Sequence, residues 1–198
     1  MLRGLPQRRS IAFPFVERIP TRLPGPMLLA PHVHGDERGF FLETYRRNVF
    51  AELGIDVDFV QDNHSRSRRG IVRGMHFQPG MGKLVRCVRG SIFDVVVDIR
   101  RGSTFGQWEG AELNDVTHHQ LYCPDGFAHG FCVLSEVADV IYGCSAYYDP
   151  ATEAGFRYDD PAVGIEWPAG LELTASPRDT AAPTLAEIAD SLPFQYAE

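Results

Sequence analysis

The central part of the chain alternates apolar and polar residues with the period of two that is typical of β-strands. The clearest example is KLVRCVRGSIFDVVVDIR, which starts at Lys83 and predicts two strands that meet at Arg89-Gly90. In the second strand, Phe93 and every second residue up to Ile99 are apolar and point to one face. The other face mixes apolar residues with Asp94 and Asp98.

Other segments extend this pattern. HQLYCP, GFAHGFCVLS and ADVIYGCSAYY also predict strands. In LETYRRNVFAELG (residues 42–54) the apolar residues fall close to one face and Gly54 follows as a stop, which predicts a helix. PTLAEIADSL, near the C-terminus, predicts a short amphipathic helix.

Five prolines between Pro6 and Pro26 break up the start of the chain, so we expect residues 1–25 to form an irregular arm. Residues 26–198 are expected to form a single domain that ends in the short helical segment. Many closely spaced strands with small turns and little helix predict a mostly β fold, an antiparallel sandwich or jelly roll.

Composition narrows the class of protein. A chain of 198 residues, 44% hydrophobic, is long enough for one well-buried domain. Its net charge of −7 argues against nucleic-acid binding, which needs a basic face. No apolar run approaches the roughly 20 residues of a membrane helix, and the first residues do not read as a signal peptide. We therefore expect no membrane partner and a cytoplasmic location.

The cysteines and histidines are the residues most able to bind a metal. The four cysteines lie in apolar segments without a C-x-x-C motif, which favours buried free thiols in a reducing compartment. Among the histidines, His32 and His34 form an H-x-H pair, while His118 and His119 are adjacent. The strand that contains His76 offers no second ligand at metal-site spacing, so the pattern disfavours a metal site.

RGMHFQPGMGKLVR, residues 73–86, places His76 between Arg73 and Lys83 in a run that otherwise resembles a buried strand. A charge on such a strand must be paired or face a pocket. With Arg38 in DERGFFLE, these cations are candidates for holding an anion, because guanidinium groups match phosphate oxygens.

Nearby charged and aromatic residues have simpler interpretations. We interpret Arg66, Arg68 and Arg69 as part of a solvated loop. Taken alone, His76 reads as a hydrogen-bonded core residue and Tyr142 as a packing aromatic. The residues by themselves leave a catalytic interpretation open.

Eight segments then occur in an order that is specific to one family. They are DERGFFLETY, FVQDNHSRS, VRGMHFQ, GKLVRCVRGSIFDVVVDIR, STFGQW, PDGFAHGF, VIYGCSAYYDP and YDDPAVGIEWP. They span roughly residues 36–168, with a weaker match to about residue 185. On these segments the chain resembles the dTDP-4-dehydrorhamnose 3,5-epimerases, cupin-fold sugar-nucleotide epimerases of deoxysugar pathways.

The resemblance implies a cupin-type jelly roll, a homodimer and catalysis without a metal or other cofactor. By the same resemblance, His76 matches the catalytic base, Asp179 its carboxylate partner and Tyr142 the general acid, and Lys83 is our first choice to stabilise an enolate oxygen. The positions that match substrate-binding residues are Arg38, Glu43, Gln61, Asp62, Asn63, Arg73, Lys83, His129, Glu153 and Arg178.

The implied reaction inverts dTDP-4-dehydro-6-deoxy-D-glucose at C3 and C5 and gives dTDP-4-dehydro-L-rhamnose, a step of dTDP-rhamnose biosynthesis. The 4-keto group acidifies the C–H bonds at both carbons, and histidine titrates close enough to neutral pH to act as a base. A tyrosine on the opposite face would return the proton.

Three alternatives stay open at this point: an epimerase that inverts only C3 or C5, a sugar-nucleotide-binding cupin without catalysis, and a metal-dependent cupin enzyme. The chain also departs from the family pattern. The stretch between His76 and Lys83 is shorter, the N-terminal arm is longer, and Arg178 stands where many members have lysine. The match around Asp179 is short.

Overall fold

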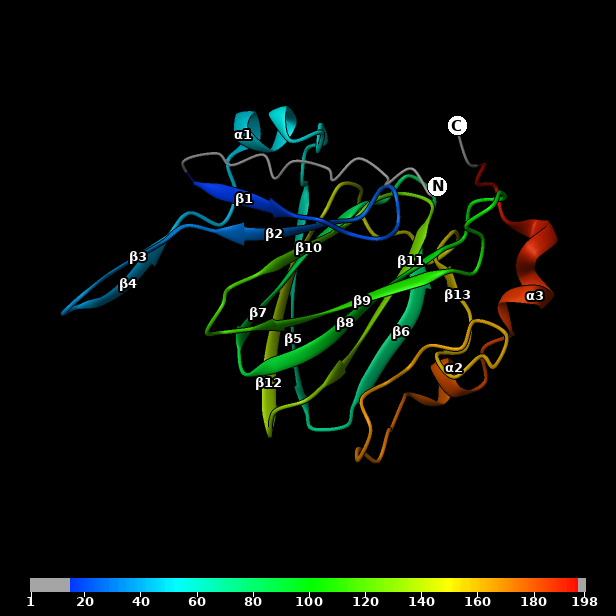
Figure 1. Cartoon of the computed structure of the whole chain (residues 1–198). Helices are drawn as coiled ribbons and strands as arrows, with labels where there is room; N and C mark the ends of the chain where they lie inside the picture. The colour runs from blue at the N-terminus through cyan, green and yellow to red at the C-terminus, as the bar shows by residue number, and fades with distance from the viewer. Residues whose placement is uncertain (1–14, 196–198) are drawn as a thin grey trace, which may run out of the picture.

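The computed structural model describes residues 15–195, which form two antiparallel β-sheets packed face to face (Figure 1). The six-stranded sheet has the order β1 (Val16–Ile19), β2 (Met27–Pro31), β10 (Gln120–Cys123), β7 (Lys83–Arg89), β12 (Val137–Cys144) and β5 (Gln61–Arg68). The five-stranded sheet has the order β13 (Ala154–Gly155), β6 (Val72–Phe77), β11 (Phe127–Val133), β8 (Ser91–Asp98) and β9 (Trp108–Asn114).

A separate hairpin and a few short helices complete the described part of the chain. The hairpin pairs β3 (Val33–Asp36) with β4 (Gly39–Leu42). The helices are α1 (Arg47–Glu52), α2 (Pro177–Thr180), α3 (Leu185–Ile188) and the 3-10 turn Ala189–Ser191. The predicted mostly β, antiparallel sandwich is therefore confirmed. Within residues 15–195, no helix has both the length and the apolar character needed to cross a membrane.

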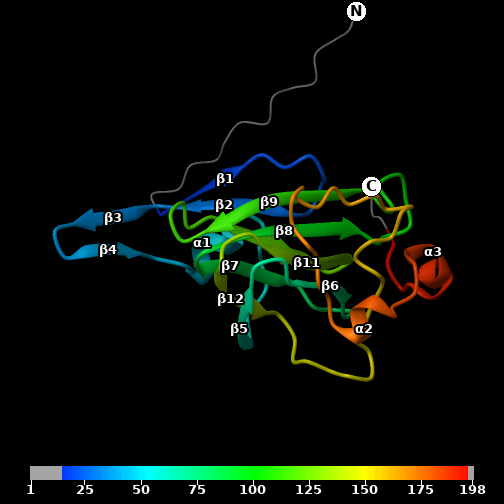
Figure 2. The same ribbon diagram turned by 90° about the horizontal axis from the view of Figure 1, so that it is seen from below.

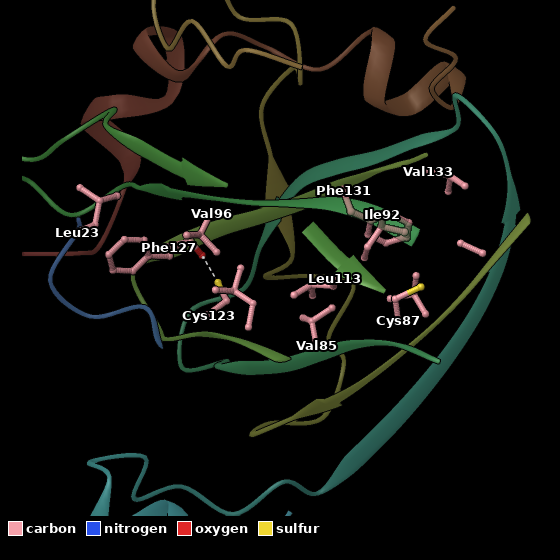
Figure 3. Packing of buried hydrophobic residues seen from close by; sticks show 13 residues of the cluster. Leu23, Val85, Cys87, Ile92, Val96, Leu113, Cys123, Phe127, Phe131 and Val133 are labelled. Carbon is pink, nitrogen blue, oxygen red and sulfur yellow. Dashed lines mark hydrogen bonds between the residues drawn. The ribbon is translucent and has the colours of Figure 1, made fainter. Parts of the chain in front are cut away.

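The main core lies between the two sheets (Figure 3). Ile92 and Val96 of β8 reach into it and meet Val85 and Val140 of the opposite sheet. The alternate residues of β8, including Val95 and Val97, join a second cluster on the other face of the five-stranded sheet. The alternation predicted for this strand is confirmed, and both of its faces are buried.

Two segments cover the outer faces of the sheets. Phe156, Leu185 and Phe194 belong to the second cluster, which brings the C-terminal part of the chain against the five-stranded sheet. Helix α1 buries Val49 and Phe50 in a third cluster with residues of the six-stranded sheet. These segments cover the outer faces, and a ligand can reach polar side chains of the sheets where the space between the sheets opens beside the core.

The structure corrects two local predictions near the N-terminus. The helix expected over residues 42–54 begins only at Arg47, because Leu42 pairs with Val33 in the β3–β4 hairpin. Part of the expected irregular arm is ordered, since β1 pairs with β2 in the six-stranded sheet. The arm's first 14 residues lie outside the described part of the chain.

The third correction concerns Arg66 and Arg68, which belong to strand β5 and not to a loop. Strand β5 lies at the edge of the six-stranded sheet and pairs with β12. Asp139 of β12 is buried and accepts hydrogen bonds from Arg66 Nε at 2.7 Å and Arg66 Nη2 at 2.9 Å. His64 Nε2 lies 3.0 Å from the same carboxylate. Chiefly through Arg66, the pKa of Asp139 is lowered to about 2.

This shift predicts a pH-dependent contribution of Asp139 to stability. A carboxylate whose pKa is lower in the folded state stabilises the fold above its unfolded pKa of about 3.9, and the contribution is lost as the pH falls through the folded value. We expect Asp139→Asn to lower the midpoint of thermal unfolding by roughly a few degrees at pH 7. The difference from the original protein should shrink between pH 4 and pH 2, which circular dichroism can follow.

Asp159→Asn is the matched control. Asp159 pairs with Arg157 at 2.7 Å, but both side chains are largely exposed. An exposed pair contributes little, so this variant should stay close to the original protein at both pH values. An unfolding difference for Asp139→Asn that is equally large at pH 7 and pH 3 would contradict the prediction.

Candidate active site

A cavity of about 510 Å3 opens between the two sheets. Strands β6 and β11 provide one wall, strands β5, β7 and β12 provide the opposite wall, and residues 174–179 close one side. Seven of the residues proposed from the sequence line it together: Arg73, His76, Lys83, His129, Tyr142, Arg178 and Asp179. Their meeting depends on the sandwich, because they come from segments far apart in the chain.

His76 and Asp179 form a short polar contact in this cavity wall. His76 Nε2 lies 2.7 Å from Asp179 Oδ1, although 103 residues separate them. Asp179 is buried in helix α2, where its backbone N–H donates to the side chain of the N-cap residue Ser176. The cap holds the short helix against strand β6, and the carboxylate orients the imidazole, whose side chain is 28% exposed.

Tyr142 lies on β12 and lines the opposite wall. Burial raises the pKa of its hydroxyl, which keeps the group protonated at neutral pH. Its partner in the adjacent strand is Asn63 of β5. A protonated hydroxyl therefore faces the cavity from one sheet, and an imidazole faces it from the other.

His129 forms a second histidine–carboxylate pair. Its Nε2 lies 3.0 Å from both carboxylate oxygens of Asp94, which is completely buried in β8. Burial raises the pKa of Asp94, whereas the nearby charges of His129 and Lys83 lower it. No role was predicted for Asp94 from the sequence. The only feature of the sequence that pointed to Asp94 is its place within a run of apolar residues, where a buried charge needs a partner.

Two cations complete the cavity walls. Arg73 of β6 donates from Nε to Ser67 Oγ at 3.0 Å, and Lys83 begins strand β7. Neither forms an ion pair with another side chain of residues 15–195, so both can meet an anionic or carbonyl oxygen. This placement agrees with the expectation that charges on these strands face a pocket.

Three more of the proposed residues lie beside the cavity. Glu153 forms an ion pair with Arg178, which stands next to Asp179. Gln61 donates to Asn63 Oδ1 at 3.1 Å, and Asn63 Nδ2 lies 3.5 Å from Cys144 Sγ, close to Tyr142.

The remaining three lie elsewhere in this chain. Arg38 pairs with Asp36 in the β3–β4 hairpin, and its side chain is 85% exposed. The hairpin projects away from the two sheets (Figure 2). Glu43 binds Arg46, and Asp62 lines a different surface depression. Within one chain, the structure does not bring Arg38, Glu43 or Asp62 to the cavity.

The four cysteines are free and buried, as the sequence predicted. Across residues 15–195, no three His, Cys, Asp or Glu side chains gather in a way that could hold a metal ion. The cavity's chemistry is that of proton transfer: a carboxylate-bound imidazole, a tyrosine opposite, and cations between them.

The fold and the site together define a class, the cupin-type jelly rolls with an acid–base cavity between the sheets. Residues 20–187 match the family described as dTDP-4-dehydrorhamnose 3,5-epimerase. The chain belongs to this family.

Individual relatives agree with this result. The dTDP-4-dehydrorhamnose 3,5-epimerase of Salmonella typhimurium is 51% identical over 84% of this chain and 94% of its own length. The dTDP-4-dehydrorhamnose 3-epimerase of Streptomyces niveus is 46% identical over 87% of this chain and 85% of its own. A crystal structure of the Legionella pneumophila dTDP-6-deoxy-D-glucose-3,5-epimerase with dTDP-4-keto-L-rhamnose superposes with a TM-score of 0.89, at 45% identity over 92% of this chain and all of that one.

Proposed function

We propose that the protein inverts dTDP-4-dehydro-6-deoxy-D-glucose at C3 and C5, giving dTDP-4-dehydro-L-rhamnose for dTDP-rhamnose biosynthesis. The observation that carries the proposal is the meeting of His76, bound to Asp179, with Tyr142 on the opposite wall of one cavity. Family membership and the relative solved with dTDP-4-keto-L-rhamnose support this substrate class.

His76 acts as the general base. Asp179 accepts a hydrogen bond from the Nε2–H group of His76, which leaves the lone pair on Nδ1 to take a proton from C3 or C5. The electron pair of the broken C–H bond moves to the 4-keto oxygen and forms an enolate. The carboxylate stabilises the imidazolium that results.

Lys83 and the His129–Asp94 pair stabilise the enolate. Lys83 and His129 come from opposite sheets and line the same cavity, so both can approach one oxygen. Removing a preorganised donor of this kind typically slows a reaction about a hundredfold or more. Asp94 holds His129 in place through its two contacts with Nε2.

Tyr142 then donates its proton to the same carbon from the other face, which inverts the centre. The proton on His76 leaves to solvent and Tyr142 regains one, so the net reaction moves no atoms in or out of the sugar. Arg73 and Arg178 bind the diphosphate, with Glu153, Gln61 and Asn63 as further substrate contacts. Binding energy from these remote groups orients the ring.

The protein acts as a homodimer in the cytoplasm under this proposal. Phe40 and Phe41 of the β3–β4 hairpin are 63% and 70% exposed, as expected of a surface that a second copy covers. Arg38 and Glu43 then reach the cavity of the partner subunit, which accounts for their distance from His76 in one chain. The buried free thiols suit a reducing compartment.

A single-centre epimerase is the second candidate. The short stretch between His76 and Lys83 favours it, because a changed wall can hold the ring in one orientation. The relative from Streptomyces niveus, which is 46% identical to this chain, is named as a 3-epimerase.

Proton NMR of the substrate with enzyme in D2O tests the function. We expect deuterium at both C3 and C5, and a coupled reductase should yield dTDP-rhamnose. His76→Ala should abolish exchange at both carbons, because it removes the proposed base. Deuterium at C3 alone would indicate the single-centre enzyme. Absence of exchange despite binding, or normal turnover by His76→Ala, would contradict the proposal.

Tyr142→Phe separates the two proton transfers. The variant keeps the base and the enolate-stabilising groups, so solvent exchange should continue while net inversion falls by roughly a hundredfold, the scale of general-acid catalysis. The measurement compares deuterium incorporation with product formed in the same sample. Equal loss of exchange and inversion would show that Tyr142 is not the acid.

Mixing two inactive variants tests the shared site. Arg38→Ala and His76→Ala should each be nearly inactive. In a random mixture half of the dimers are mixed and each has one intact site of two, so about a quarter of the original activity should return. The control combines His76→Ala with Asp179→Asn, which damage the same cavity and should not complement. Failure of the first mixture would place Arg38 outside the partner's site.

A further inference from the structure

Residues 145–153 cross from one sheet to the other beside the cavity, and we name this segment the crossing loop. It leaves β12 of the six-stranded sheet just after Tyr142 and enters β13 of the five-stranded sheet. Figure 2 shows it running from β12 towards α2, the helix that contains Asp179. None of residues 145–153 lines the cavity, so the loop acts on the site through the residues that it contacts.

The loop's large side chains are not buried. Tyr147 is 72% exposed and Tyr148 is 52% exposed. Its backbone is held instead by the side chain of Gln78, which is only 5% exposed. Gln78 Nε2 donates to the Tyr147 carbonyl at 2.9 Å, and Gln78 Oε1 accepts from the Asp149 N–H at 2.8 Å. The buried amide of Gln78 thus forms hydrogen bonds with the backbone on both sides of Tyr148.

Neighbouring contacts strengthen this attachment. Gln61, at the start of β5 in the other sheet, accepts from the Tyr148 N–H at 2.9 Å. Gly82 exchanges two hydrogen bonds with Ser145, one through the serine hydroxyl at 2.8 Å and one between backbones at 2.9 Å. The short stretch between His76 and Lys83 therefore holds the first part of the crossing loop, from Ser145 to Asp149.

The loop's position is transmitted to the cavity through Arg178. Glu153, the last residue of the loop, pairs with Arg178, which lines the cavity next to Asp179. The pKa of the Arg178 guanidinium is raised mainly by Glu153, with a smaller contribution from Tyr148. Two loop residues thus face a cation that the proposed function assigns to the substrate diphosphate.

We infer that Gln78 is a positioning residue that holds the crossing loop, and with it Glu153 and Arg178, in the conformation that binds the sugar nucleotide. The inference rests on the proposed function. Gln78 touches no reacting atom in this arrangement, so its effect falls on binding and not on proton transfer. When only a fraction of the protein has the competent loop, apparent affinity falls by that fraction.

Steady-state kinetics of Gln78→Leu test the inference. The substitution removes both hydrogen bonds and keeps a similar volume. Each lost hydrogen bond changes a conformational equilibrium severalfold, so KM should rise about tenfold while kcat stays within about threefold. Gln107→Leu is the matched control, because Gln107 donates to the Ser103 carbonyl in an exposed turn and should change neither constant.

A second variant distinguishes the loss of these hydrogen bonds from a folding defect. Gln78→Glu keeps the acceptor for Asp149 N–H and places an oxygen against the Tyr147 carbonyl, so KM should again rise with kcat nearly constant. Unchanged KM in both variants, or a fall in kcat at constant KM, would overturn the inference. Failure of the original protein to exchange deuterium would instead refute the proposed function, so the two failures are distinct.

Discussion

Strand β11 lies between β6 and β8, and its antiparallel register with both decides which side chains reach the cavity. His129 is the cross-strand partner of His76, so two imidazoles on adjacent strands face the same side of the sheet. On β8 the same face presents Asp94, two residues from the partner of His129. A slip of one residue would turn His129 away from both. Every residue of β11 is buried, and its pairing with β6 shifts register between His129 and Phe131.

Three buried carboxylates each need a hydrogen-bonded partner, and the resulting pairs serve either the fold or the cavity. A buried charge needs hydrogen-bonded partners, and each of these has an imidazole or guanidinium group within reach. Asp139 binds Arg66 and thereby ties an edge strand to the sheet. Asp179 and Asp94 bind histidines that line the cavity. The first arrangement supports the fold, whereas the other two set the orientation of side chains that face a ligand.

Local periodicity was enough to predict the β fold, the two strands around Gly90 and the faces of β8. It failed where long-range pairing overrides local preference: Leu42 joined a hairpin and Val16–Ile19 joined a sheet. The site was harder to predict, because His76 and Asp179 are 103 residues apart and only the family resemblance connected them. The role of Gln78 could not be predicted from the sequence, because its partners are backbone groups of a loop without a periodic pattern.

The geometry also explains how one fold can support one inversion or two. C3 and C5 both flank C4, so one base and one acid can serve either carbon once the ring presents it, while the enolate oxygen stays near Lys83 and His129. The number of inversions then depends on the walls that permit the ring to turn. The crossing loop contacts one of these walls through the ion pair between Glu153 and Arg178, and Gln78 and Gly82 attach the loop to the stretch after His76. Under the proposed function, the stretch between His76 and Lys83 therefore acts on the bound sugar nucleotide indirectly, because the loop that it attaches pairs with Arg178 in the cavity wall.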